Sequence, residues 1–463
     1  MLPGIRPAHR RILPMDRVPQ PSRLRVHGAS SPQVGPGGET PPELAGEDAC
    51  ATRARRCSAL MRVQSCWRWT LSVLTLAAWL GMLAGAKAQV FSSGSTGAYG
   101  PMNITTNTIL LVPTNGIFHC TTLNVAAGAT LTFTRNSLNT PIYLLATGDV
   151  TISGVIDVSG KAGRQALAGE GGAGGFNGGE PATSDHELPG DGQGPGAGKA
   201  QSGNSSNSSA AGDAAYGGVP GNNTVTNGGG IYGAALLIPI VGGSGGGGGL
   251  GSPGYGGGGG GGAILIASST KVVLAGSINA AGGNGTPFLA GGGSGGGIRL
   301  VAPVTAGTGG FSVQGGSGSG YRPPNYIIAD TAGVGRIRID SPDRSNWNFT
   351  FTGRTTYGNT MVVFPAVVPQ LNIIEVAGQA ISAGATGAVE VGLPGTASTN
   401  QTVKIQARDF TGPIPIFVVV TPFSGPASTY SAVINMSAGS VATVTVPIVL
   451  PVGVTSRIHA WTR

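Results

Sequence analysis

The sequence predicts an all-β protein: a short parallel β-helix or related solenoid with long glycine-rich loops, followed by a small β-sandwich domain. Three observations lead to this prediction. Alternating apolar stretches recur in register, glycine tracts interrupt them at one point of the repeat, and a glycine-poor C-terminal region alternates throughout. No segment after residue 88 shows a convincing helical pattern.

The composition indicates a chain that folds. Glycine accounts for 84 of 463 residues, well above the usual ~7 %. Charged residues make up only 10 % and hydrophobic residues 40 %, which argues against charge-driven disorder. The length leaves room for two or three domains.

The formal net charge of +8 belongs to the N-terminus. Of 27 basic and 19 acidic residues, 12 and 5 precede position 89, which leaves 15 basic and 14 acidic residues in the rest. A nearly neutral remainder gives no reason to expect nucleic acid or an anionic membrane as a partner.

The segment 61–88 has the pattern of a secretion signal. Arg62 and Arg68 precede an apolar run from Leu71 to Leu83, and Ala86-Lys87-Ala88 form a small-x-small cleavage site before Gln89. A transmembrane anchor, the alternative, normally needs ~20 apolar residues. We therefore expect export with cleavage near Ala88–Gln89 and no integral membrane segment afterwards.

Residues 1–60 are rich in Pro and Arg and show no periodicity. We interpret them as a disordered leader or as a mis-assigned start, with Met61 as the initiator. Cys50, Cys57 and Cys66 would leave with this region and the signal, so Cys120 alone would remain. A single cysteine excludes an internal disulfide and a cysteine-based zinc site in the mature chain.

An internal repeat is the strongest structural signal. After strand-and-turn patterns over 89–139, the units 141–160, 262–282, 296–316 and 335–353 align. Two apolar rows fall in register, namely Ile142, Ile264, Ile298 and Ile337, and Leu144, Ile266, Leu300 and Ile339. Because one unit cannot bury its apolar row alone, the units must stack into a solenoid. An antiparallel glycine-rich β-roll or sandwich is the alternative.

The glycine-rich loops follow the first three units at the same point of the repeat, so we expect them to leave from one corner of the solenoid. The longest is the insertion 161–261. It could be a disordered linker, since ordering glycine costs the most entropy. It could also pack as extended polyglycine strands, which the apolar stretch Ile231–Val241 favours.

The composition shifts near Pro365–Gln370, which divides the solenoid (89–365) from a second domain (366–463). This domain loses the glycine runs and alternates in short stretches, among them 388–393, 402–407, 414–421, 431–436 and 443–450. Such spacing is typical of a small β-sandwich.

The candidate catalytic residues are Arg299, Arg338 and Asp340. The two arginines align in the repeat, so they should stack on one outward face with Asp340 beside them. Parallel β-helix polysaccharide lyases and hydrolases use such residues. However, Tyr143 and Leu265 occupy the same ladder position, and hydrolysis needs two carboxylates. A solvated surface or edge feature is the alternative.

Other motifs indicate neither cofactor nor metal binding. His119, His186 and His459 lie far apart in sequence, without ligand spacing. Gly198-Lys199 lacks the serine or threonine of a P-loop. The Gly/Asp patch at Asp191 lacks the repeated nonapeptide of calcium β-rolls.

The blocks ATGDVTISGVIDVSG, GGGGGGGAILIAS, GGGSGGGIRLVAP and GVGRIRID resemble glycine-rich secreted bacterial proteins with predicted β-helical repeats. The resemblance covers about 100–355 and implies location and architecture, because the family has no established activity. A weaker similarity is to haemagglutinin-type adhesin repeats.

Three functional hypotheses follow. The first is a secreted or cell-surface structural and adhesion-type protein without catalysis, whose partners are surface glycans or other cell-surface components. The second is a carbohydrate-active enzyme, a polysaccharide lyase or hydrolase, on the β-helix. The third is a binding module with a flat polyglycine surface that contacts ice or glycans. The periplasm is an alternative location, and the oligomeric state is not predicted.

Overall fold

A computed structural model describes residues 22–28, 91–183, 188–202, 210–220, 228–285, 290–322, 326–367, 369–382, 389–423, 427–437 and 439–462. The predicted signal peptide and His186 lie outside these residues. The chain divides into two units, and the following concerns the one that contains 1–33 and 92–463. Within the described residues there are only strands, and no helix could cross a membrane.

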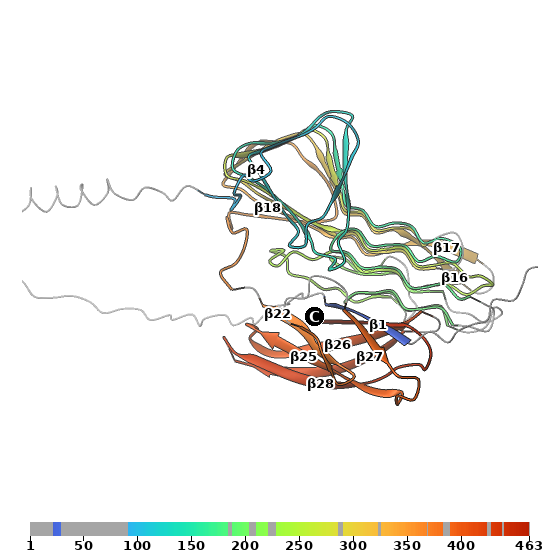
Figure 1. Ribbon diagram of the computed structural model, residues 1–463. Helices are drawn as coiled ribbons and strands as arrows, with labels where there is room; N and C mark the ends of the chain where they lie inside the picture. The colour runs from blue at the N-terminus through green and yellow to red at the C-terminus, as the bar shows by residue number, and fades with distance from the viewer. Residues whose placement is uncertain are drawn as a thin grey trace, which may run out of the picture. The chain divides into compact units, whose positions relative to one another are not determined.

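The first part is a parallel β-helix of three sheets with six strands each. The first sheet contains β4 (Ile117–Cys120), β7 (Ile142–Ala146), β10 (Ala263–Ser268), β13 (Gly297–Val301), β18 (Arg336–Asp340) and β21 (Arg354–Gly358). The second contains β2 (Pro101–Ile104), β5 (Thr122–Val125), β8 (Val150–Ile152), β11 (Lys271–Leu274), β14 (Val304–Gly307) and β19 (Asp343–Trp347). The third contains β3 (Thr108–Leu111), β6 (Thr130–Thr134), β9 (Val155–Asp157), β12 (Ser277–Asn279), β15 (Gly310–Ser312) and β20 (Thr350–Thr352). The coils stack as triangles (Figure 1).

The predicted register of the repeat is confirmed. Ile264 pairs with Ile142 on one side and Ile298 on the other, and Ile298 pairs with Ile337. These side chains are almost fully buried and form the core of the helix with the apolar residues of the other two sheets. Parallel strands put identical rows on top of each other, so an apolar position in one coil is covered by its counterpart in the next.

The β-helix also extends further toward the N-terminus than the four aligned units. Strands β2 to β6, within 101–134, pair in parallel with the following coil and supply a further part of each sheet. The sequence indicated strands and turns here but no repeat, because these strands have four or five residues and different loops. Leu123 and Leu131 point into the same core.

The C-terminal part is the predicted sandwich of two sheets. One has the order β24 (Val389–Leu393), β1 (Ser22–Gly28), β29 (Ser456–Thr462), β26 (Gly412–Pro422) and β27 (Ser428–Met436). The other has the order β23 (Gln379–Ala380), β22 (Gln370–Val376), β25 (Asn400–Arg408) and β28 (Val441–Val449). Strands β24 to β28 overlap the five alternating stretches. Their alternate residues, such as Ile405, Ile416 and Ile458, form the core between the sheets.

Strand β1 comes from residues 22–28, within the predicted leader and far from the rest of the sandwich in sequence. It pairs antiparallel with β24 and parallel with β29. The remaining residues of 1–60 lie outside the described residues, so for them the prediction of a leader stays a prediction.

Candidate functional site

The glycine-rich loops all connect a strand of the third sheet to the next strand of the first sheet. They follow β9, β12 and β15 and lead to β10, β13 and β18, and the last carries the hairpin of β16 (Ser317–Arg322) and β17 (Tyr326–Thr331). Figure 1 shows them running side by side away from one corner of the β-helix. We refer to the described residues of 158–262, 280–296, 313–316 and 332–335 as the polyglycine bundle.

The central segment 256–263 shows how the bundle is held together. Its backbone N–H groups donate hydrogen bonds of 2.8–3.0 Å in three directions, each direction recurring at every third residue. In the first direction the acceptors are Arg164, Lys161 and Val158, which bond to Gly256, Gly259 and Gly262. In the second they are Gly179, Phe176 and Ala173, which bond to Gly257, Gly260 and Ala263. In the third they are Gly291 and Ser294, which bond to Gly258 and Gly261. In a β-strand, successive backbone N–H groups would point in two alternating directions. A period of three is that of the polyproline II helix, which forms no internal hydrogen bonds.

A second central segment, 243–249, repeats this pattern. Gly243, Gly246 and Gly249 donate to residues of the neighbouring segment 255–261, whereas Gly245 and Gly248 donate to Gln193 and Gly190. All residues of 242–249 are buried. Backbone groups in the interior are therefore paired with neighbouring segments rather than with water, as burial requires.

Close packing explains why the segments consist of glycine. A Cβ added to Gly257 would lie 2.6 Å from the carbonyl carbon of Gly246 and would overlap its oxygen. A Cβ on Gly258 would meet the backbone of Gly283 in the same way. Only glycine allows backbones to approach this closely. Of the two sequence-based interpretations, extended polyglycine segments packing against one another is therefore what the structure contains.

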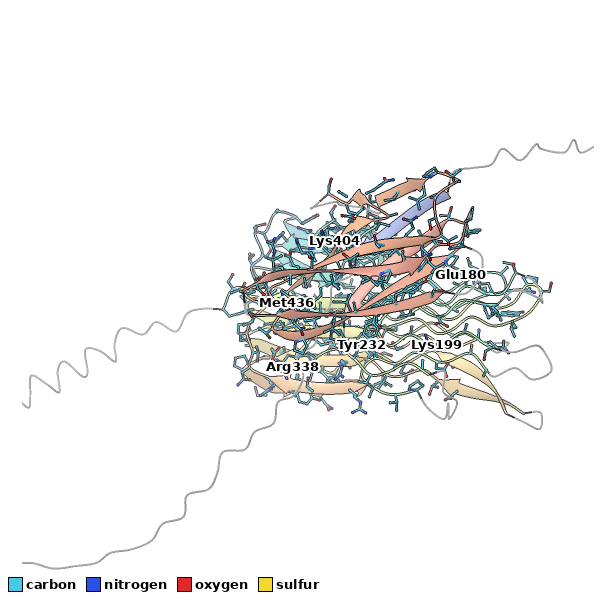
Figure 2. The ribbon with its side chains drawn as sticks, turned by 90° about the horizontal axis from the view of Figure 1, so that it is seen from below. Glu180, Lys199, Tyr232, Arg338, Lys404 and Met436 are labelled. Carbon is cyan, nitrogen blue, oxygen red and sulfur yellow. The ribbon has the colours of Figure 1, made fainter. Side chains whose placement is uncertain are left out.

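Within the bundle, two tyrosines bind the ends of the apolar stretch 231–241 to neighbouring segments. Tyr232, labelled in Figure 2, donates a hydrogen bond from Oη to Gly242 O at 2.6 Å and accepts one from Ser244 Oγ. Tyr216 donates to Val241 O at 3.0 Å, and the ring centroids of the two tyrosines lie 4.7 Å apart. Burial raises the pKa of both phenols. Both tyrosines therefore act as neutral, buried anchors.

One carboxyl group lies inside the bundle. Asp213 is 2 % exposed and accepts the Gly292 N–H at 2.6 Å. Its pKa is raised to about 7, chiefly by burial and also by the nearby Asp330, while the hydrogen bond from Gly292 partly opposes the rise. The charge of Asp213 thus depends on pH in a range where most carboxyl groups are ionised.

The three candidate catalytic residues meet in a buried ion cluster. Asp340 accepts two hydrogen bonds from Arg299, at 2.8 and 3.1 Å, and two from Arg338, at 2.6 and 2.9 Å. Arg299 and Asp340 are fully buried and Arg338 is 7 % exposed. The sequence correctly places the arginines in one ladder. The expectation that these side chains lie on a solvated outward face is wrong, because another part of the chain covers them.

The cover is the chain that follows β21. Thr360 accepts a hydrogen bond from Arg299 at 3.1 Å through its carbonyl and donates its N–H to Asp340 at 3.2 Å. Phe364 packs on Tyr143, with ring centroids 5.1 Å apart, and burial raises the Tyr143 pKa to about 12. The cluster is thus an internal ion network with one carboxylate, in which Nε and Nη2 of both arginines bond to Asp340 and the buried Nη1 of Arg299 has no hydrogen-bond partner among the described residues.

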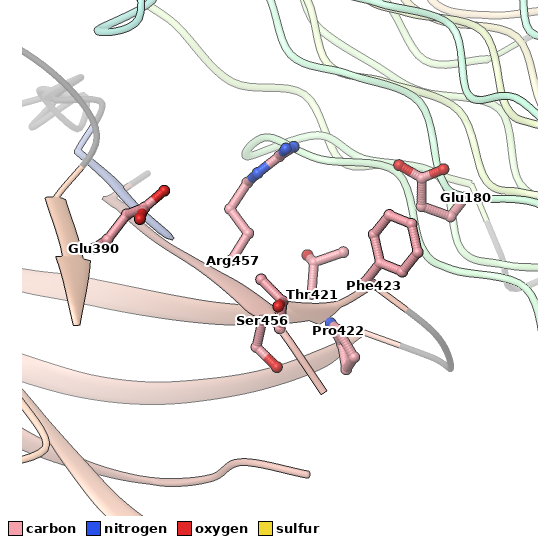
Figure 3. Close-up of a pocket in the computed structure, with 8 residues that line it drawn as sticks. Glu180, Glu390, Thr421, Pro422, Phe423, Ser456 and Arg457 are labelled. Carbon is pink, nitrogen blue, oxygen red and sulfur yellow. The ribbon is translucent and has the colours of Figure 1, made fainter. Parts of the chain in front are cut away.

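A cavity of about 420 Å³ lies elsewhere, and sequence reasoning missed it. Glu180 of the bundle lines it together with Glu390, Thr421, Phe423, Ser456 and Arg457 of the sandwich (Figure 3). Burial raises the Glu180 pKa, and Arg457 opposes this shift. The cavity volume lies within the range of small-molecule pockets, roughly 300–1,000 Å³. These residues come from four separate stretches with no shared motif, so no signal in the sequence links them.

The two histidines with described side chains, His119 and His459, lie in different parts of the fold. His119 accepts a hydrogen bond from Thr96 N at 3.2 Å in the β-helix, whereas His459 lies in β29 of the sandwich. Among the residues that the structure describes, no three His, Cys, Asp or Glu side chains group as metal ligands would. Comparison with protein-family models, curated proteins and solved structures finds no match to this chain.

Proposed function

We propose that the protein is a secreted or cell-surface structural and adhesion-type protein without catalytic activity, exported by a signal cleaved near Ala88–Gln89. Its expected partners are surface glycans or other cell-surface components. The polyglycine bundle is the observation that carries the proposal. A large, internally hydrogen-bonded and sparsely charged body suits a rigid extracellular scaffold better than a reaction centre.

Two further features support a scaffold role. The buried ion cluster of Arg299, Arg338 and Asp340 faces the chain segment that covers it instead of an open groove. Cys120, the only cysteine of the described residues, is buried and free, so backbone ladders and packing rather than disulfides hold this part together. A large core and many backbone hydrogen bonds suit an extracellular protein without disulfides, whereas small secreted domains usually need disulfides to stay folded.

The experiment is cell fractionation combined with an adhesion assay. Antibody detection should find the chain, starting at Gln89, in the medium or on the outer surface, and a strain without it should bind glycan-coated surfaces less well. The variant Gly257→Ala should reduce both surface display and adhesion because it overpacks the bundle, whereas Gly395→Ala, with open space around its Cβ, should not. Cytoplasmic retention would contradict the export step.

Catalysis is tested separately. The purified protein should release no product from pectins, alginates or glycosaminoglycans. Polysaccharide cleavage that disappears in Arg299→Ala and Asp340→Ala, with the fold retained, would replace the proposed function by an enzymatic one.

A further inference from the structure

Strand β1 occupies a place in the sandwich that the proposed export would empty. It comes from residues 22–28, which precede the predicted signal peptide. Cleavage near Ala88–Gln89 would separate it from the exported chain. Moreover, the positive charges in front of the apolar run keep the leader on the inner side of the membrane. Outside, the sandwich would therefore lack its own β1.

The vacated slot is a complete site for one strand. On one side, residues 22 to 26 pair antiparallel with Leu393 to Val389; on the other, residues 24 to 28 pair in parallel with Ser456 to Ala460. Neighbouring strands lie ~4.8 Å apart, so the slot is one strand wide. Both of its edges would present unpaired N–H and C=O groups, which is the standard template for strand addition.

The buried residues beside the slot determine which peptide sequences can bind there. Val391 of β24 and Ile458 of β29 are 2 % and 0 % exposed and belong to the sandwich core. Register position 24 lies beside Val391, and position 26 lies beside Ile458. Residues two apart share one face of a strand. An occupant therefore needs apolar residues at these two alternate positions, where the sequence of β1 has Leu24 and Val26.

Both walls of the slot have supports other than β1. Strand β29 pairs with β26 on its far side. Strand β24 has no other strand partner among the described residues, but Gln379 Nε2 donates a hydrogen bond to Gly392 O at 3.1 Å, and Val391 packs in the core. Each wall thus has contacts that do not involve β1.

We propose that the slot between β24 and β29 is a strand-acceptor groove, which in the exported protein binds an extended segment of a partner protein with apolar residues at two alternate positions. The proposal rests on the export step of the proposed function. Such strand addition would couple a surface scaffold to a neighbouring protein through main-chain hydrogen bonds and two apolar anchors.

The test uses a synthetic peptide of residues 20–30 (QPSRLRVHGAS) as the probe. Exported protein, shown by intact mass to start at Gln89, should bind the peptide and unfold at a higher temperature in its presence. The same peptide with Leu24→Asp and Val26→Asp should not bind. The full chain, whose own strand competes at an effective concentration of about 1 mM, should bind the probe more weakly, by about the ratio of that concentration to the Kd of the probe for the exported protein.

The outcomes separate the two proposals. Exported protein that starts at Gln89 but binds no probe overturns the groove, and so does a dimer of the exported chain that excludes the probe. If the mass shows that the leader is retained, the export step fails, and the groove is tested in the full chain carrying Leu24→Asp and Val26→Asp. That variant should bind the probe because its own strand no longer fits; absence of binding would overturn the groove independently of export.

Discussion

At the scale of single residues, burial sets the properties of the charged groups. Asp213 in the bundle and Asp340 in the β-helix are both buried carboxyl groups, but their surroundings differ. Asp340 is paired with two arginines. Asp213 has one backbone donor and another carboxyl group, Asp330, nearby. We therefore expect the ion pairs of Asp340 to stabilise the fold and the ionised form of Asp213 to oppose folding.

Asp213 makes stability depend on pH. Its pKa rises from 3.8 to about 7 on folding, so between these values the folded state holds a proton that the unfolded state has released. The free energy of unfolding should therefore fall by roughly 1.4 kcal/mol per pH unit across this window and level off above it. Denaturant titrations of Asp213→Asn should lack this slope. The surface variant Asp149→Asn should keep it, and an unchanged slope in Asp213→Asn would contradict the assignment.

Asp340 is tested by its removal. Asp340→Asn leaves two buried arginines without their carboxylate, which should lower the free energy of unfolding by about 3–5 kcal/mol. Asp149→Asn is the matched control, since Asp149 is 46 % exposed and pairs with Lys271 at 3.2 Å. An exposed pair should contribute at most about 1 kcal/mol. Equal effects of the two variants in thermal or denaturant unfolding would show that the cluster is not buried in solution.

At the scale of elements, the polyglycine segments depend on the missing Cβ. Gly257→Ala places a methyl group against the carbonyl of Gly246 and should destabilise the bundle by about 1–3 kcal/mol or more. Gly395→Ala meets no atom within 4 Å and should change stability by less than about 0.5 kcal/mol. Calorimetry of both variants compares them directly. Equal stability of Gly257→Ala and the natural protein would argue against close packing.

The elements also show what a sequence can predict. Alternation and register identify the β-helix strands, because rows such as Ile142, Ile264 and Ile298 repeat at one place in each coil. Alternation likewise locates β24 to β28. The structure of the glycine segments is not predictable in this way, because without side chains they have no periodicity, and their order arises from backbone hydrogen bonds between distant segments.

The cluster of Arg299, Arg338 and Asp340 is predictable from the sequence only as far as the repeat determines it. The repeat places Arg299 and Arg338 in one ladder, and Asp340 follows two positions later. That Thr360 and Phe364 cover them depends on the irregular path after β21, for which the sequence has no pattern. The cavity between Glu180 and Arg457 also joins residues that are remote in sequence.

At the scale of the whole molecule, the backbone hydrogen bonds between the coils of the β-helix continue into the polyglycine bundle. Strands β10, β13 and β18 of the first sheet each continue directly from a bundle segment, so the spacing between coils also spaces the polyglycine segments. The β-helix supplies an apolar core, and the bundle replaces side-chain packing by backbone hydrogen bonds. The rigidity of the bundle therefore depends on the regular stacking of the coils.

Hydrogen exchange measured by mass spectrometry on 242–262 tests the folded bundle most directly. The buried N–H groups of Gly246, Gly257 and Gly258, which donate in different directions at 2.9 Å, should exchange as slowly as those of the β-helix strand β10. Gly257→Ala should speed exchange across the bundle more than in β10. Exchange of 242–262 at the rate of an unfolded glycine-rich chain, with β10 still protected, would contradict the hydrogen-bonded polyglycine bundle.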